Sequence, residues 1–303
     1  MISHGIFTGR PRRLPPALLA ALFPALLMLA ALTALAAPGQ AAAAACPAGA
    51  VEPGRSVEAI RAGGTIMIGV YRAKPPFGYT DAQGEYQGYD VYYARRLARD
   101  LGVEPCFVPV DPATRVEMLN SGRADVILAN FTVTPERAEL VDFCLPYMKV
   151  ALGVVSPRSA PVRTVEELRG RTLITIRGTR AEKYFDWHYP EIHQLRFDTH
   201  AMAYAALHAG LGDAFANDNK EVLAWALSHR GFVVGIDTLG DIDTIAPAVR
   251  KGNRDLREWI NHHLRELGRE QFFHRAYKLT LAPVYGSATD AEAVVIEGGV
   301  VRM

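Results

Sequence analysis

The chain has 303 residues, half of them hydrophobic, which suits two domains of ordinary size. It carries 33 basic and 32 acidic side chains, and the first 45 residues hold three of the Arg residues and no acid. The remainder is therefore slightly acidic. A chain without a basic surplus lacks the electrostatic footprint of a nucleic-acid-binding protein, so we expect no nucleic-acid partner.

The N-terminus has the order of a secretory signal. Arg10, Arg12 and Arg13 precede an uncharged stretch rich in Leu and Ala, which ends in five consecutive alanines. We predict a signal peptide over residues 1–45 and an exported, periplasmic protein. The apolar part is long for a signal, so an uncleaved membrane anchor stays the alternative.

The three cysteines leave two questions open. Cys46 directly follows the alanines, an arrangement that resembles a lipoprotein attachment site, although an Ala replaces the usual large aliphatic residue three places before it. Cys46 is therefore a candidate for lipid attachment. Cys106 and Cys144 could pair in an exported protein, or they could be two small buried residues on apolar strands. The sequence does not decide between these two alternatives.

From residue 65 onward, short β-rich runs alternate with amphipathic segments. Strands are predicted at residues 65–70, 106–110, 125–129, 151–155, 172–176, 195–197, 214–216, 232–234 and 245–249. Helices are predicted at residues 90–101, 180–188, 199–209, 219–228, 254–267 and 269–279, with further helix starts near 112, 135 and 164. Strands that alternate with helices favour α/β lobes with mostly parallel sheets.

No long linker separates two lobes, so the boundary must be a short crossing. Residues 147–152 and 239–244 are the two crossings that we predict. The resulting division is a signal peptide (1–45), an N-terminal linker (46–60), a discontinuous lobe 1 (61–147 and 244–285), lobe 2 (148–243) and a C-terminal tail (286–303).

Ligands of open α/β sheets gather at the carboxyl ends of the strands. After the strand at 125–129, Asn130 and Thr132 precede a helix start that brings Arg137 back one turn later. A guanidinium there can donate two parallel hydrogen bonds to a carboxylate. The alternative is a surface Arg137 that pairs with Glu136 or Glu139.

Two further strand ends carry polar groups. Ile176 ends a strand before the turn formed by Gly178, Thr179 and Arg180, where exposed N–H groups favour an anion. Asp218 ends another strand and can receive an ammonium group, cap the following helix, or do both. One cation for a carboxylate and one anion for an ammonium describe a receptor for a zwitterion.

Across residues 61–280 the chain resembles the extracellular polar amino-acid-binding proteins of ABC importers. The resemblance is carried by GVYRAKPPFGYTDAQGEYQGYDV, SGRADVILANFTVTPERAELVDFCLPY, LRGRTLITIRGT, GDAFANDNKEVLAWA and IAPAVRKGNRDLREWINHHL, in this order. It implies a two-lobe periplasmic-binding-protein fold, with a mostly parallel sheet flanked by helices in each lobe and a two-strand hinge. It also implies a ligand in the cleft, an ABC permease of the inner membrane as partner, a monomer, and neither cofactor nor metal.

The resemblance also implies roles for single residues. Arg137 should bind the α-carboxylate with Thr132 and the amides of Thr179 and Arg180, and Asp218 should bind the α-ammonium with the carbonyl of Asn130.

Tyr89 should form an aromatic wall, and Tyr71 and Lys74 fall where family members contact the ligand side chain. Other members often have an Asp and an aromatic residue at these last two positions, so Arg, Lys and ornithine are disfavoured as ligands. Lys74 either favours an acidic side chain or points to solvent.

The stretch NFTVTPERAELVDFCLPYMKVALGV is similar to the cysteine-binding members, so L-cysteine is the first ligand that we expect, with other small polar or acidic amino acids next. The alternative function is a cyclohexadienyl (arogenate or prephenate) dehydratase, which resembles these receptors. Such an enzyme needs a proton donor, for which Glu182 and His188 are the candidates.

Overall fold

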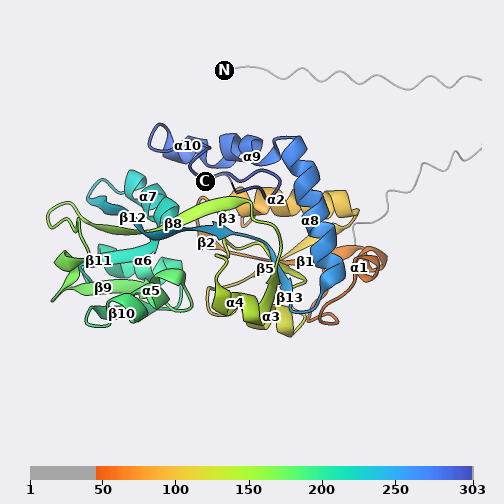
Figure 1. Ribbon diagram of the computed structural model, residues 1–303, viewed down its shortest axis with the longest axis horizontal. Helices are drawn as coiled ribbons and strands as arrows, with labels where there is room; N and C mark the ends of the chain where they lie inside the picture. Colours follow the sequence, from red (N-terminus) through yellow and green to blue (C-terminus); the bar gives the residue numbers. More distant parts are fainter. Residues whose placement is uncertain (1–45, 302–303) are drawn as a thin grey trace, which may run out of the picture. The chain divides into compact units, whose positions relative to one another are not determined.

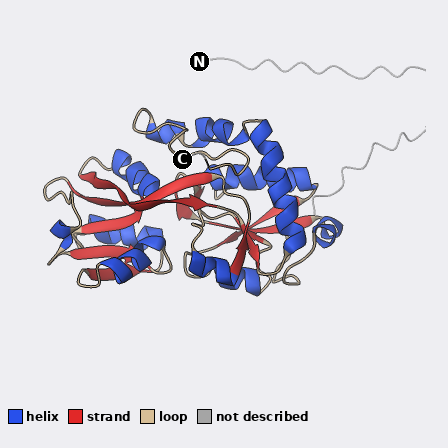
Figure 2. Ribbon diagram, in the orientation of Figure 1, coloured by secondary structure: helices blue, strands red, loops and turns tan. Residues whose placement is uncertain are grey.

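The structure, a computed structural model, describes residues 46–301; the predicted signal peptide lies outside this range. The described residues form two five-stranded sheets with helices packed against them (Figure 1, Figure 2). No helix within residues 46–301 is long and apolar enough to cross a membrane.

The first sheet has the strand order β5-β1-β6-β13-β7, and we call the part built on it lobe 1. Its strands are β1 (Thr65–Val70), β5 (Glu104–Pro109), β6 (Val126–Ile127), β7 (Val141–Phe143) and β13 (Ala248–Arg250). Its helices are α1 (Val57–Gly63), α2 (Tyr89–Leu101), α3 (Arg115–Asn120), α4 (Pro135–Leu140), α8 (Arg254–Arg269), α9 (Phe272–Thr280) and α10 (Ala282–Tyr285). A small sheet of β2 (Ala73–Lys74), β3 (Gly78–Thr80) and β4 (Tyr86–Gln87) completes it.

The second sheet has the order β10-β9-β11-β8-β12, and we call this part lobe 2. Its strands are β8 (Met148–Pro157), β9 (Thr172–Ile176), β10 (His193–Phe197), β11 (Ala214–Asp218) and β12 (Phe232–Ile245). Its helices are α5 (Arg180–His188), α6 (His200–His208), α7 (Asn219–Ser228) and the short 3₁₀ helix η1 (Glu166–Leu168).

Local sequence explains most of these elements. All six residues of β1 are buried, as expected for a strand between two parallel neighbours. Helix α2 buries its apolar positions at helical spacing and ends at Gly102, whose φ of 81° lies in the left-handed region. The predicted start of α4 is confirmed, because the Thr134 side chain accepts a hydrogen bond from the Arg137 N–H and Pro135 follows the cap.

Some predictions differ from the structure. The sheets are mixed, because β13 runs antiparallel to β6 and β7, and β8 runs antiparallel to β11 and β12. The helix expected near residue 112 begins at Arg115, since residues 112–114 form a turn. Strands β8 and β12 are much longer than predicted and pair with each other from Met148 opposite Ile245 to Pro157 opposite Phe232. Figure 1 shows these two strands of the second sheet running side by side toward the first sheet, as a two-strand hinge would lie.

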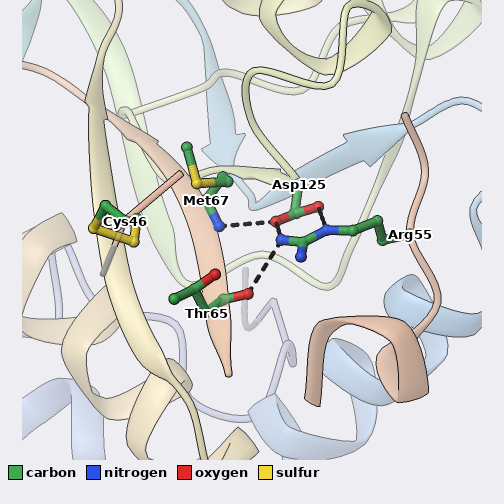
Figure 3. Close-up of a disulfide and its surroundings, with 6 residues drawn as sticks. Cys46, Arg55, Thr65, Met67 and Asp125 are labelled. Atoms are coloured by element: carbon green, nitrogen blue, oxygen red, sulfur yellow. Dashed lines mark hydrogen bonds and ion pairs between the residues drawn. A yellow bond between two sulfur atoms is a disulfide. The ribbon is translucent and has the colours of Figure 1, made fainter. Parts of the chain in front are cut away.

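The N-terminal segment, predicted as a linker, is held against lobe 1 by a disulfide and an ion pair. A disulfide joins Cys46 to Cys106 on β5, and the Arg55 side chain binds Asp125 through Nε–H at 3.0 Å from Oδ1 and through Nη2 (Figure 3). Arg55 also donates to the carbonyl oxygen of Thr65 at 3.1 Å. Residues 46–56 are therefore fixed to lobe 1 before α1 begins.

The disulfide bears on both questions that the sequence left open about cysteine. Cys106 pairs with Cys46 and not with Cys144, which is a buried free thiol. A thioether-linked lipid would need the same Cys46 sulfur that forms the disulfide, so the candidate lipid attachment at Cys46 does not fit this structure. The two cysteines of the pair are 60 positions apart, so the bond depends on the tertiary fold and has no local sequence pattern.

The C-terminal tail also packs into lobe 1. Val294, Val295 and Ile296 are buried, the first two in the main core of lobe 1. The Lys149 N–H donates to the Val294 carbonyl at 2.7 Å, so the tail adds a short pairing to the first residues of β8. The residues after Gly286 are thus part of the folded lobe.

Candidate functional site

Most predicted site residues come from three strand ends, and Tyr71 and Lys74 come from the segment that contains β2. Thr132 and Arg137 follow β6, Gly178 and Thr179 follow β9, and Asp218 ends β11. Each of these segments lies at the carboxyl end of its strand, at the edge of the sheet that faces the other lobe. Contacts between them therefore join lobe 1 to lobe 2.

Arg137 joins the two lobes. Its Nη1 donates to the Thr132 carbonyl at 2.8 Å within lobe 1, and its Nη2 donates to the Gly178 carbonyl at 2.9 Å in lobe 2. Burial, followed by the nearby charge of Arg115, lowers the pKa of Arg137 to about 9. Among residues 46–301, Arg137 makes no ion pair with an acidic side chain, and the pairing with Glu136 or Glu139 is not seen. This cation is held by carbonyl oxygens, which a ligand carboxylate can replace.

The Gly178 turn faces lobe 1 with its carbonyl group. Gly178 has φ of 77°, and its N–H donates to Glu182 Oε2 at 2.9 Å. The Thr179 N–H donates to the Ile176 carbonyl at 3.2 Å. Two of the N–H groups expected to bind an anion are therefore engaged within lobe 2. A Cβ atom at Gly178 would lie 2.7 Å from the Cα atom of Ala113, so only glycine allows this approach.

The other residues of this turn are placed away from the centre. The Arg180 side chain pairs with Asp243 at 3.2 Å, and Ile176 is buried in the core of lobe 2. A cavity of about 350 Å³ opens beside Arg137, Gly178, Thr179 and Arg180. Its walls also include Leu140 of lobe 1 and Trp187 of lobe 2, both exposed.

Lys74 lies at the centre of the interface between the lobes. It is 2% exposed, and its Nζ donates to Asp218 Oδ2 at 2.5 Å and to Asn130 Oδ1 at 2.6 Å. Burial works to lower the pKa of Lys74, but Asp218 and Glu221 act in the opposite direction and the net effect raises it. Lys74 is therefore a buried ammonium group and does not point to solvent. Asn130 faces this site with its side chain, whereas the sequence analysis assigned that role to its carbonyl.

Glu221 is the first candidate site residue that the sequence analysis missed. Its Oε2 lies 3.3 Å from Lys74 Nζ, and its side chain is 1% exposed. Burial raises the pKa of Glu221 to about 7, although Lys74 works against this. Glu221 lies in the first turn of α7, and Asp218, three residues earlier, directly precedes the helix. This spacing puts both carboxylates on one side of the helix start. That spacing is the signal that could have identified it.

The buried cluster around Lys74, Asp218 and Glu221 includes three further side chains: Tyr71, His200 and Arg115. The rings of Tyr71 and His200 meet edge to face with centroids 4.8 Å apart. Burial, together with the charges of Lys74 and Arg115, lowers the pKa of His200 well below its usual value, so the imidazole is neutral. The Arg115 guanidinium lies 4.0 Å from the centroid of the Phe131 ring and donates to the Ala129 carbonyl at 3.1 Å. No local sequence motif indicates Arg115 or His200, because only the tertiary fold brings these two side chains to the site.

Tyr89, predicted as an aromatic wall, lies in the core of lobe 1. It is fully buried, and its ring packs against Tyr147 and Phe273 at centroid distances of 6.0 and 6.2 Å. The structure thus places Tyr89 behind the site. Tyr71, which is buried and whose ring centroid lies 5.4 Å from Lys74 Nζ, is the aromatic residue that faces it.

Residues 66–279 match the family model of the bacterial extracellular solute-binding proteins, family 3. A glutamine-binding protein of an ABC transporter from Bacillus subtilis (strain 168) is 29% identical over 228 residues, which are 74% of this chain and 83% of that protein.

Two solved structures resemble the chain more strongly. A cysteine-binding protein from Campylobacter jejuni is 47% identical with a TM-score of 0.78, covering 80% of this chain and 98% of that one. A solute receptor for L-cysteine from Neisseria gonorrhoeae is 47% identical with a TM-score of 0.79, covering 80% of this chain and 100% of that one.

Proposed function

The chain belongs to family 3 of the bacterial extracellular solute-binding proteins, and we propose that it binds one free L-amino acid between its two lobes and delivers it to an ABC importer. The observation that carries the proposal is the pair of opposite charges at the lobe interface. Arg137 offers a guanidinium held by two carbonyls, while Asp218 and Glu221 offer two buried carboxylates.

Binding follows from hinge closure around a zwitterion. The ligand carboxylate docks on Arg137 and displaces the Gly178 carbonyl, and the ligand ammonium meets Asp218 from lobe 2. Closure removes water from both charge contacts and strengthens them, because the effective dielectric constant falls. The ligand favours the closed state since only that state offers both charges.

L-cysteine is the ligand that we propose first, with other small polar or acidic amino acids next. The support comes from the two structures that are 47% identical, since both are described as binding cysteine. We further propose a periplasmic monomer whose partner is an ABC permease of the inner membrane.

The dehydratase alternative required Glu182 or His188 as a proton donor. Glu182 accepts a hydrogen bond from the Gly178 N–H through Oε2 and pairs with Arg196 through Oε1 at 3.1 Å. His188 packs against Tyr184 with ring centroids 4.6 Å apart. These contacts do not favour the enzyme, and an assay for phenylpyruvate formation from prephenate separates the two functions.

The proposal is tested by calorimetry of the purified protein with the twenty amino acids, followed by Arg137→Ala. We expect micromolar or tighter binding of L-cysteine in the wild type. Loss of Arg137 should reduce affinity at least 100-fold, because a buried carboxylate without its partner costs about 3–5 kcal/mol.

Arg254→Ala, on the exposed start of α8, is the control that removes one Arg at a distance from the site. Binding of L-cysteine by Arg137→Ala within threefold of the wild type would remove the carboxylate assignment.

A further inference from the structure

We propose that Asp218 and Glu221 together hold two positive charges, one from Lys74 and one from the ligand ammonium, and that Lys74 thereby excludes amino acids with a cationic side chain. The inference rests on the proposed function, because it assigns the charge that this same site accepts. It gives Lys74 and Glu221 a role in specificity.

The positions of the two carboxylates make them one site. Asp218 directly precedes α7 and Glu221 lies in its first turn, and both face Lys74 from lobe 2. Their side chains are only 7% and 1% exposed, so water cannot compensate a second negative charge. With Lys74 as the one cation beside both groups, burial raises the pKa of Glu221 to about 7, and a second cation would favour its ionised form.

The neighbouring side chains do not supply a second positive charge to Asp218 and Glu221. His200 Nε2 lies 3.8 Å from Glu221 Oε2, but its imidazole is neutral. Arg115 directs its donors to backbone carbonyls. Asp90, a further buried carboxyl group, accepts from Tyr147 Oη at 2.7 Å and from a backbone N–H, so it belongs to lobe 1 and not to this pair.

Lys74 is built to stay in place. It leaves β2 of lobe 1, where α6 of lobe 2 packs against the strand, and its Nζ lies 5.4 and 5.8 Å from the ring centroids of Tyr71 and Phe77. These rings and the Asn130 oxygen solvate the ammonium group in addition to the carboxylates. With Lys74 fixed and the ligand ammonium bound, a cationic side chain on the ligand would find no unmatched carboxylate.

A double-mutant cycle tests this count of charges. Lys74→Met vacates one cation position, so L-ornithine should bind at least tenfold more tightly than it binds the wild type. Glu221→Gln leaves Lys74 paired with Asp218 alone, so L-cysteine should bind at least tenfold more weakly. The double variant Lys74→Met with Glu221→Gln restores one carboxylate for one ammonium. It should recover L-cysteine binding at least tenfold relative to Glu221→Gln and lose the gain for L-ornithine.

Lys74→Arg, which keeps the charge, is the matched control and should still exclude L-ornithine. Far-UV circular dichroism and thermal melting confirm that each variant is folded. If Lys74→Met does not fold, Glu221→Gln and the double variant still decide, because a double variant no better than Glu221→Gln overturns the inference.

Two other results would also overturn it: no gain for L-ornithine in a folded Lys74→Met variant, or unchanged L-cysteine binding in Glu221→Gln. A wild type that binds none of the twenty amino acids would instead refute the proposed function itself. If the wild type binds L-cysteine but the variants bind L-cysteine and L-ornithine as the wild type does, only the role of Lys74 is refuted.

Discussion

At the scale of single residues, the site depends on charges that are buried and only partly matched. Arg137 is bound by the carbonyls of Thr132 and Gly178, and burial holds its pKa near 9. Asp218 has Lys74 as its partner in this structure, 2.5 Å away. Arg137 is therefore arranged to exchange a backbone carbonyl for a ligand carboxylate, which keeps the cost of binding low, whereas Asp218 keeps Lys74 and gains the ligand ammonium.

The role of Asp218 can be tested with analogues that lack the ammonium group. Asp218→Asn should weaken the binding of L-cysteine at least 30-fold but change the binding of 3-mercaptopropionate less than threefold, because only the first ligand carries an ammonium. Competition calorimetry measures both affinities. Asp213→Asn is a control just before the same strand, since Asp213 accepts a hydrogen bond from the Thr172 N–H away from the site. Equal losses for the two ligands would remove the ammonium assignment.

At the scale of elements, the turn between β9 and α5 determines how closely the lobes approach. Gly178 takes φ of 77° and lies against the backbone of Pro112 and Ala113 in lobe 1. A side chain at this position would meet backbone atoms, which cannot move aside as a flexible side chain can. The close contact of the lobes thus requires glycine for two reasons, its conformation and its size.

Gly178→Ala should therefore impair closure more than it impairs folding. We expect a loss of L-cysteine affinity of at least tenfold, with a melting temperature close to that of the control. Gly170→Ala is that control, because Gly170 also has a positive φ of 73° in lobe 2, but a Cβ atom added there would meet no other atom within 4 Å. Both variants carry the cost of about 1–2 kcal/mol for a left-handed residue other than glycine. Unchanged affinity in Gly178→Ala would show that the turn need not dock on lobe 1.

At the scale of the whole molecule, lobe 1 is tied together from both ends of the described chain. The disulfide between Cys46 and Cys106 fixes the N-terminal segment, and Val294 and Val295 fix the C-terminal tail on the first residues of β8. Lobe 2 is one uninterrupted segment that is inserted between the two. Such an arrangement leaves β8 and β12 as the paired strands that continue from one lobe into the other.

Loss of the disulfide should lower the stability of the protein. Cys46 and Cys106 are 60 residues apart, and a cross-link over such a loop stabilises the folded state by about 4 kcal/mol in the chain-entropy model. Cys46→Ser should therefore reduce the free energy of unfolding in urea, and a reductant should do the same to the wild type. Cys144→Ala keeps the disulfide and should stay sensitive to the reductant. A Cys46→Ser variant as stable as the wild type would exclude a structural role for the bond.

The sequence by itself determined the class of fold and most of the elements, because these depend on local periodicity and on caps such as Thr134 and Thr179. It also singled out Arg137 and Asp218 as candidates, since Arg137 follows a buried strand and Asp218 ends one. Only the tertiary structure decided that Cys46 pairs with Cys106, that Tyr89 lies behind the site, and that Lys74 meets Glu221. These contacts join residues from 58 to 184 positions apart, and such pairings depend on how the strands and lobes pack, which no local pattern encodes.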